Sequence, residues 1–321
     1  MLIVTNGDSA VSALKKAGIP GHIFPWRDVL HEGPVPTTES LEAESDVRAE
    51  FIAGRGWGPP DRVREDFRLR DKKLASARHH DELVLWFEHD LYDQLQLLQI
   101  LSYLATEPPE DTILSLVCRD AFVTHTSVDL LDQWFEDRAP LDDAQISLGR
   151  EAWDAFTQPT PEPWADLLDS DTAALPFLAD SVERHLEEFP GPADGLSRSE
   201  RQILTAVEQG HATPGAVFRA SQEMEEAAFM GDASFWYTLT GLILGTAPLL
   251  AAEGEFRLPD GPTPGPGFLS QPLDFTTAGR DVLAGKVDWL SLHPLDKWLG
   301  GIHLGPSMWR WDPEARQLLS S

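Results

Sequence analysis

The stretch ELVLWFEHDLYDQLQLLQIL, residues 82–101, passes from an apolar run into an amphipathic pattern. The run LVLWF, residues 83–87, shows no polar alternation, which is typical of a parallel strand covered on both faces. The leucines that follow recur at helical spacing, at Leu91, Leu95, Leu98 and Leu101. Between the two patterns lie Glu88, His89 and Asp90. The sequence therefore predicts a strand that continues into a helix through a cluster of titratable groups.

Three further short strands are predicted, LIVT at 2–5, GHIF at 21–24 and TILSLVC at 112–118. A helical pattern over residues 10–17 follows the first strand and ends at Gly18, and Asp8 or Ser9 is a candidate helix cap. Strands that alternate with helices indicate parallel βα units. We therefore predict a Rossmann-like α/β domain with a parallel sheet over residues 1–126.

The remainder of the chain is predicted to form a helical connector and a second domain. Residues 37–78 are polar and helical in pattern, with a break at GRGWGPP, and residues 127–194 form the connector, which ends in the linker FPGPADG. At LSRSERQIL a new module begins with a capping box of Ser197 and Glu200.

This C-terminal module, residues 195–321, is predicted to be a winged-helix-like α+β domain. Further helices are expected to begin at Pro214 and Asp232, followed by a hairpin at PLLAAEGEFRL and a helix near residues 274–285. The end, KWLGGIHLGPSMWRW, is predicted to be a hairpin that turns at residues 305–307. Its tryptophans are expected in a core or an interface, and they are Trp298, Trp309 and Trp311.

Charge and composition limit the classes of partner. Asp and Glu number 53 against 25 Lys and Arg, giving a formal net charge of -28, and this surface repels nucleic-acid backbones and anionic lipids. A salt-rich cytoplasm and a genome that prefers Arg both explain the composition. The single cysteine, Cys118, indicates no oxidising compartment. We see no signal peptide and interpret the apolar residues 235–252 as a buried helix followed by a strand, so we expect a soluble, cytoplasmic protein without membrane contact.

Several segments resemble a bacterial family called domain of unknown function 1835. They are TNGDSA at 5–10, PWRDVLHEGPVP at 25–36, LWFEHDLYDQLQLLQIL at 85–101, LEEFPGPADGLSRSERQIL at 186–204, GRDVLAG at 279–285 and WLGGIHL at 298–304. The last three are similar to the C-terminal half of longer members. The family's name assigns no activity, so the resemblance supplies neither a function nor catalytic residues.

Polar groups follow all four predicted strands of the sheet. Ligands of open parallel sheets bind beyond the carboxyl ends of the strands, so these groups are predicted to face one crevice. As catalytic residues we predict Glu88, His89, His31 and Asp28. As ligand-binding residues we predict Asn6, Gly7, Asp8, Ser9, Trp26, Arg27, Asp90, Asp93 and Arg119.

Structural roles compete with these assignments. Asp90 can cap the following helix, and Asp93 suits the dipole in its first turn. Arg27 and Asp28 can pair with each other, and His31 can bond a loop carbonyl. Capping does not explain Glu88 or His89.

The chemistry of the crevice leaves two classes of reaction open. Carboxylates with imidazoles suit a divalent metal with water as the nucleophile, or general acid–base chemistry. Arg27, Arg119 and the helix start after NGDS suit a phosphate. The sequence contains neither a dinucleotide-binding nor a Walker fingerprint, and it lacks zincin and serine-hydrolase motifs.

The leading hypothesis is a small-molecule site for a phosphate-bearing, nucleotide-like ligand, with hydrolase or transferase chemistry. The cofactor stays unknown, and a divalent metal is one candidate. The alternative is a non-enzymatic scaffold or regulator that contacts a protein partner or a second copy through its winged-helix-like module. Metal dependence, substrate and oligomeric state stay open.

We predict that the intact protein does not bind duplex DNA at physiological ionic strength. Residues 197–285 contain eleven acidic and five basic residues, and the helix expected to enter the groove, residues 232–243, carries no Lys or Arg. Non-specific DNA binders reach dissociation constants of about 10⁻⁴ to 10⁻⁶ M. A gel shift with random duplex at micromolar protein measures this, and a retarded band in moderate salt would contradict the prediction.

Overall fold

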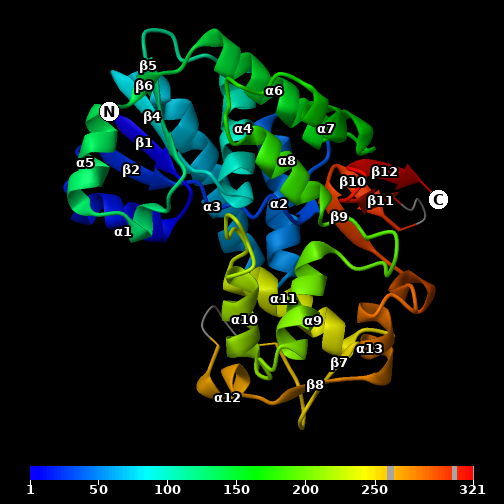
Figure 1. Ribbon diagram of the computed structural model, residues 1–321. Coiled ribbons are helices and arrows are strands. Elements are labelled where there is room, and N and C mark those ends of the chain that lie inside the picture. The colour runs from blue at the N-terminus through cyan, green and yellow to red at the C-terminus, as the bar shows by residue number, and fades with distance from the viewer. Residues whose placement is uncertain (259–263, 306–308, 321) are drawn as a thin grey trace. The chain divides into compact units, whose positions relative to one another are not determined.

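The computed structural model describes residues 1–258, 264–305 and 309–320. The chain divides into two compact units, which we call the N-terminal unit, residues 1–183 with 298–302, and the C-terminal unit, residues 184–297 with 303–321. Most of the helices expected between residues 127 and 183 thus belong to the N-terminal unit. Figure 1 shows the order of the elements along the chain.

A five-stranded sheet forms the centre of the N-terminal unit, in the order β2-β1-β4-β5-β6. The strands β1 (Leu2–Thr5), β2 (His22–Pro25), β4 (Glu82–Glu88) and β5 (Ile113–Arg119) are parallel to one another. The edge strand β6 (Ala139–Pro140) is antiparallel to β5 and was not predicted. The mostly parallel sheet confirms the predicted α/β fold class.

Helices cover both faces of this sheet (Figure 1). On one face α1 (Asp8–Lys16) and α5 (Val128–Glu136) share a hydrophobic cluster with Val84 and Trp86 of β4. The alternate residues of β4 face the other side, where α4 (Leu91–Thr106) lies. α4 is buried on several faces because α6 (Asp143–Phe156) packs against it.

The polar segment after the second strand forms the two predicted helices, α2 (Leu41–Gly54) and α3 (Pro60–Ala75). The helices α7 (Glu162–Ala165) and α8 (Leu178–Leu186) follow α6. Short 3₁₀ helices are formed by Ser76–His79, Val123–His125, Asp166–Asp169 and Trp289–Ser291.

A small parallel pairing explains the glycines of the segment WLGG. β3 (Gly33–Pro34) pairs with β9 (Lys297–Gly300) through Leu299 and Gly300. Gly300 has a φ of +61°, and a Cβ there would lie 2.6 Å from the Phe156 carbonyl oxygen. Only glycine fits this turn without strain, so the pairing depends on it.

The C-terminal unit contains the three predicted helices α9 (Arg198–Glu208), α10 (Pro214–Gln222) and α11 (Asp232–Leu244). The capping box of Ser197 and Glu200 is present. Two short helices follow, α12 (Pro266–Leu269) and α13 (Thr277–Leu283). Within the described parts of the chain, no helix is long and apolar enough to cross a membrane.

Two predicted hairpins are wrong. β7 (Leu250–Ala252) pairs with β8 (Leu273–Phe275), so the wing-like pair joins distant segments and PLLAAEGEFRL is not a local hairpin. At the C-terminus β10 (Ile302–Leu304) pairs with β9, while β11 (Trp309–Asp312) pairs with β12 (Gln317–Ser320). The predicted turn at residues 305–307 lies mostly outside the described residues.

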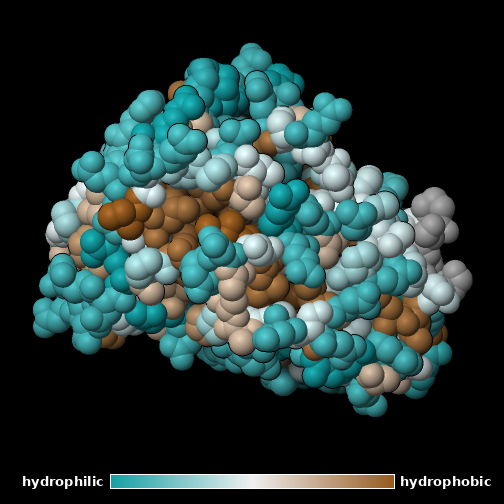
Figure 2. Space-filling view, turned by 90° about the horizontal axis from the view of Figure 1, so that it is seen from above, coloured by the Kyte–Doolittle hydropathy of each residue, from teal (hydrophilic) through white to brown (hydrophobic). Residues whose placement is uncertain are grey.

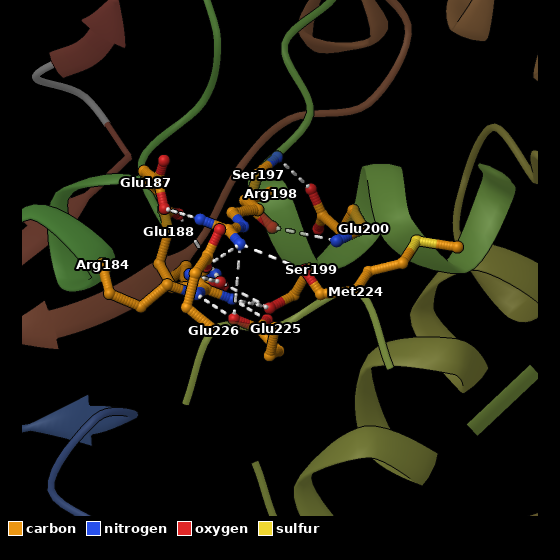
Figure 3. Close-up of polar contacts among 11 residues, drawn as sticks. Arg184, Glu187, Glu188, Ser197, Arg198, Ser199, Glu200, Met224, Glu225 and Glu226 are labelled. Carbon is orange, nitrogen blue, oxygen red and sulfur yellow. Dashed lines mark hydrogen bonds and ion pairs between the residues drawn. The ribbon is translucent and has the colours of Figure 1, made fainter. Parts of the chain in front are cut away.

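A buried network of charges links the start of α9 to neighbouring segments of the C-terminal unit. Arg184 contacts Glu188 at 2.9 Å and Glu225 at 2.7 Å, and its Nη2 also donates to Ser199 Oγ. Figure 3 shows these side chains pointing toward one another. Lys297 lies 3.5 Å from Glu188 and supplies a second cation. Each buried carboxylate here has a cationic partner, so the network is a structural one.

The surface carries the excess of polar residues expected from composition. Figure 2 shows hydrophilic residues over most of the face in view, with hydrophobic residues gathered in a band between them. The large hydrophobic side chains with high exposure include Ile113, Val128, Leu130 and Leu244.

Candidate functional site

Asn6 joins two strand ends of the sheet. It follows β1, and its Nδ2 donates to Asp93 Oδ2 at 2.7 Å and to Glu88 Oε2 at 3.3 Å. Glu88 is the last residue of β4, and its Oε1 accepts from the Val123 backbone N–H at 2.6 Å. Since β1 and β4 are parallel neighbours, their carboxyl ends bring these side chains together.

Glu88, Asp90 and Asp93 form a buried cluster of three carboxylates, which we call the acidic triad. One ligand oxygen from each lies within 4.8 Å of the others, and none of the three side chains is more than 7% exposed. Asp90 is the N-cap of α4 and accepts from Asp93 N–H, as predicted. Asp93 in turn accepts from Glu88 N–H at 2.7 Å. Within the described residues, none of the three forms an ion pair with a Lys or Arg.

Burial without a counter-charge shifts these groups toward their neutral forms. Burial, then repulsion from Glu88, raises the pKa of Asp90 from its ordinary 3.8 to about 7. Burial raises the pKa of Asp93 and of Glu88 as well. The contrast is Glu188 in the C-terminal unit: burial there raises the pKa, but Lys297 and Arg184 outweigh it and lower the net value. The triad therefore needs either protons or a cation.

The start of α1 offers backbone N–H groups next to Asn6. Gly7 is the N-cap and has no side chain to accept hydrogen bonds from the first turn. This corrects the prediction that Asp8 or Ser9 caps α1, since both lie inside the helix and are exposed. An open helix start suits an anion.

Arg27 lies against this helix start. Its guanidinium donates two hydrogen bonds to the Asp8 carboxylate, at 2.6 and 2.9 Å, in an exposed pair. Its backbone N–H donates to Asn6 O at 3.0 Å, which continues the pairing beyond β1 and β2. Arg27 has a φ of +53°, a costly conformation for a residue with a Cβ. The alternative considered from the sequence, a pair between Arg27 and Asp28, does not form, because Arg27 pairs with Asp8.

Asp28 is fully buried and is held by two arginines from the α2–α3 hairpin. Arg48 Nε lies 3.0 Å from one of its oxygens, and Arg70 Nη1 lies 3.2 Å from the other. Arg48 also donates to the carbonyl oxygens of Glu32, Pro34 and Val29. The loop PWRDVLHEGPVP is thus organised by Arg48, and Asp28 is its anchor.

His31 and Trp26 are both buried. The His31 ring meets the Tyr92 ring edge-on at 6.1 Å between centroids, which places it beside the first turn of α4. Trp26 Nε1 donates to Gln99 Oε1 at 2.6 Å, and the Arg70 guanidinium lies over the Trp26 ring. Both the indole N–H and the ring face of Trp26 are therefore in contact with other side chains of the fold.

His89 packs between two phenylalanines. Its ring centroid lies 5.2 Å from that of Phe122 and 5.9 Å from that of Phe177. Burial lowers its pKa, with Asp120 and Asp180 opposing. Its Nδ1 is buried and has no hydrogen-bond partner in the described chain. Arg119, opposite Glu88 in the register of β4 and β5, donates to the Cys118 carbonyl.

The structure therefore brings together Asn6 with the acidic triad, and Arg27 with Asp8 at the start of α1, where Gly7 and Ser9 also lie. It directs Asp28 into ion pairs and His89 into an aromatic contact. Sequence reasoning missed Arg48 and Arg70. Both helices contain many charged residues, so these two arginines are not distinguished from the solvated ones by sequence pattern.

Comparison with known proteins adds no relative: no protein-family model matches the chain, and no curated protein matches it. The resemblance to domain of unknown function 1835 stays a prediction.

We predict that Asp28→Asn destabilises the protein strongly. The substitution removes the buried carboxylate that pairs with Arg48 and Arg70 and leaves both guanidiniums without it. Removing one partner of a buried ion pair lowers the free energy of unfolding by about 3–5 kcal/mol. Asp8→Asn is the matched control, because it removes one carboxylate from an exposed pair worth about 0–1 kcal/mol. Urea denaturation measures both, and equal losses would show that Asp28 is not an anchor.

We predict that Asp90→Asn stabilises the cation-free protein above pH 7. The raised pKa of Asp90 means that the folded state binds the proton more tightly, so stability falls as the pH rises from about 4 through 7. Asn caps helices as well as Asp and has no charge to bury. The variant should gain up to about 4 kcal/mol at pH 8 and nothing below pH 4.

The measurement is denaturation across this pH range with a chelator present. A variant that is less stable than the wild type at pH 8 would mean that the Asp90 charge is compensated in solution.

Proposed function

We propose that the N-terminal unit binds a phosphate-bearing, nucleotide-like small molecule together with a divalent cation at the carboxyl edge of its sheet. Hydrolysis or group transfer at the phosphate is the reaction class. The acidic triad holds the cation, and the start of α1 with Arg27 receives the phosphate. Asn6 lies between the two because it contacts Glu88 and Asp93 and directly precedes Gly7.

The observation that carries the proposal is the acidic triad, buried and without an ion-pair partner among the described residues. Hard divalent cations prefer carboxylate oxygens. Ca²⁺ bonds oxygen at about 2.3–2.6 Å, so two of its ligands lie at most about 5 Å apart. The 4.8 Å limit within the triad satisfies this spacing, and Mg²⁺ or Mn²⁺ requires a small contraction. The cation supplies the charge that protons supply in its absence.

The anion side is supported by two independent features. The N-cap Gly7 leaves the first-turn N–H groups of α1 without a side-chain acceptor, and space around its Cα is open. Arg27 stands beside them on a strained backbone, and strained residues concentrate at functional sites. A guanidinium forms bidentate bonds to phosphate oxygens, as it now does to Asp8.

We assign different parts to the predicted catalytic residues. Glu88 binds the cation, and His89, neutral at pH 7, is the candidate proton acceptor through its unpartnered Nδ1. Asp28 and His31 position the loop that carries Arg27, because the Asp28 carboxylate is already paired with Arg48 and Arg70.

The test is thermal unfolding of the full chain with Mg²⁺, Mn²⁺ or Ca²⁺, alone and with a panel of nucleotides. A cation should raise the melting temperature, and more at pH 8 than at pH 6, because binding displaces protons from the triad. Ligand at about a hundred times its dissociation constant stabilises by about 2.7 kcal/mol. Asp93→Asn should abolish the cation effect, whereas Asp132→Asn, an exposed carboxylate on α5, should retain it.

Arg27→Ala separates the two halves of the site. It should retain the cation effect and lose the additional stabilisation by the nucleotide. If no cation or nucleotide shifts the wild type, the proposal fails, and the scaffold hypothesis takes its place.

A further inference from the structure

A second buried carboxylate, Glu44, lines a cavity between α2, α4 and α6. The cavity measures about 230 Å³, and Glu44 is only 5% exposed. Gln99 donates a hydrogen bond to Glu44 Oε1, and among the described residues Oε2 accepts none. Hydroxyls and aromatic rings form much of the remaining lining, from Thr37, Thr38, Ser40, Ser102, Tyr103, Thr106, Trp153 and Thr157.

The charges packed around Glu44 leave it uncompensated. Arg48 and Arg70 are the neighbouring cations, and they pair with Asp28 and Asp71. Two cations thus face three buried or half-buried carboxylates, and within the described chain Glu44 forms no ion pair. Burial accordingly raises the pKa of Glu44 to about 7. A bound cation would supply the missing charge.

The surroundings of the cavity favour a cation as well. A larger cleft of about 730 Å³ adjoins it, sharing Leu41 and Tyr103. Seven acidic residues line this cleft, namely Glu39, Glu42, Asp46, Asp61, Glu65, Asp71 and Glu107, against the three basic residues Arg64, Arg68 and Lys72. The only cation that lines the smaller cavity in the described chain, Arg150, is 3.7 Å from Asp154. Such a rim attracts cations and repels anions.

We propose that this cavity is a binding site for a small organic ammonium ion, with the ammonium group on Glu44 and the aliphatic part directed toward the larger cleft. Tyr103 also lines the cavity, and an aromatic ring can attract an ammonium ion through a cation–π interaction. A volume of about 230 Å³ is below the roughly 300–1,000 Å³ of drug-sized sites, so the ligand is a short amine or diamine. This site is separate from the acidic triad and does not depend on the function proposed for it.

The test is isothermal titration calorimetry of the full chain at pH 8 with 1,4-diaminobutane as the probe. The neutral 1,4-butanediol, of the same length, is the matched control and should not bind. Glu44→Gln retains an acceptor for Gln99 but removes the charge, and it should weaken diamine binding at least tenfold. Asp132→Asn removes one charge from an exposed position on α5, outside the lining of both cavities, and should bind like the wild type.

A second variant guards against misfolding as an explanation. Ser102→Leu fills the cavity without changing any charge, and it should also abolish diamine binding. The proposal is overturned if the wild type gives no binding heat with the diamine, if the diol binds equally, or if folded Glu44→Gln and Ser102→Leu bind like the wild type.

Discussion

The paired guanidiniums of Arg48 and Arg70 on Asp28 are the interaction on which the N-terminal unit depends. Asp28 lies in a loop with little regular pairing, and Arg48 donates to three of its carbonyl oxygens while it neutralises the carboxylate. The loop in turn places Arg27 beside the start of α1. Removal of one partner would leave a buried charge unpaired. The stability of the Asp28 loop therefore depends on the α2–α3 hairpin, and the position of Arg27 at the sheet edge depends on that loop.

The buried carboxylates of this protein fall into two groups, those with a cationic partner and those without one. Glu188 and Asp28 are buried acids with cations in contact, and their places are structural. Asp90 and Glu44 are equally buried, and the described residues give neither an ion pair, so the pKa of each is raised to about 7. A buried carboxylate without an ion pair lacks a compensating positive charge, and a cationic ligand can supply it.

The sequence predicted those parts of the fold that depend on local pattern. The apolar run before Glu88 and the leucines after it are sufficient for a parallel strand and helix, and strand ends then converge by topology. Pairing between distant segments was not predictable in this way. β7 pairs with the distant β8 and not with a neighbouring segment. Arg48 pairs with Asp28 although its helix is rich in charged residues and looks exposed from its sequence. Neither contact leaves a periodic trace in the chain.

Helix capping and ligand binding are not exclusive roles for Asp90. The cap bond from Asp93 N–H fixes one oxygen of Asp90, and the bond from Glu88 N–H fixes one of Asp93. Each carboxylate oxygen has two lone pairs, so a bond to an N–H group leaves room for a cation. The same bonds hold the triad in place before any ligand arrives, which lowers the cost of ordering it. In the proposed site, the chemistry that starts α4 is therefore what positions the acidic triad.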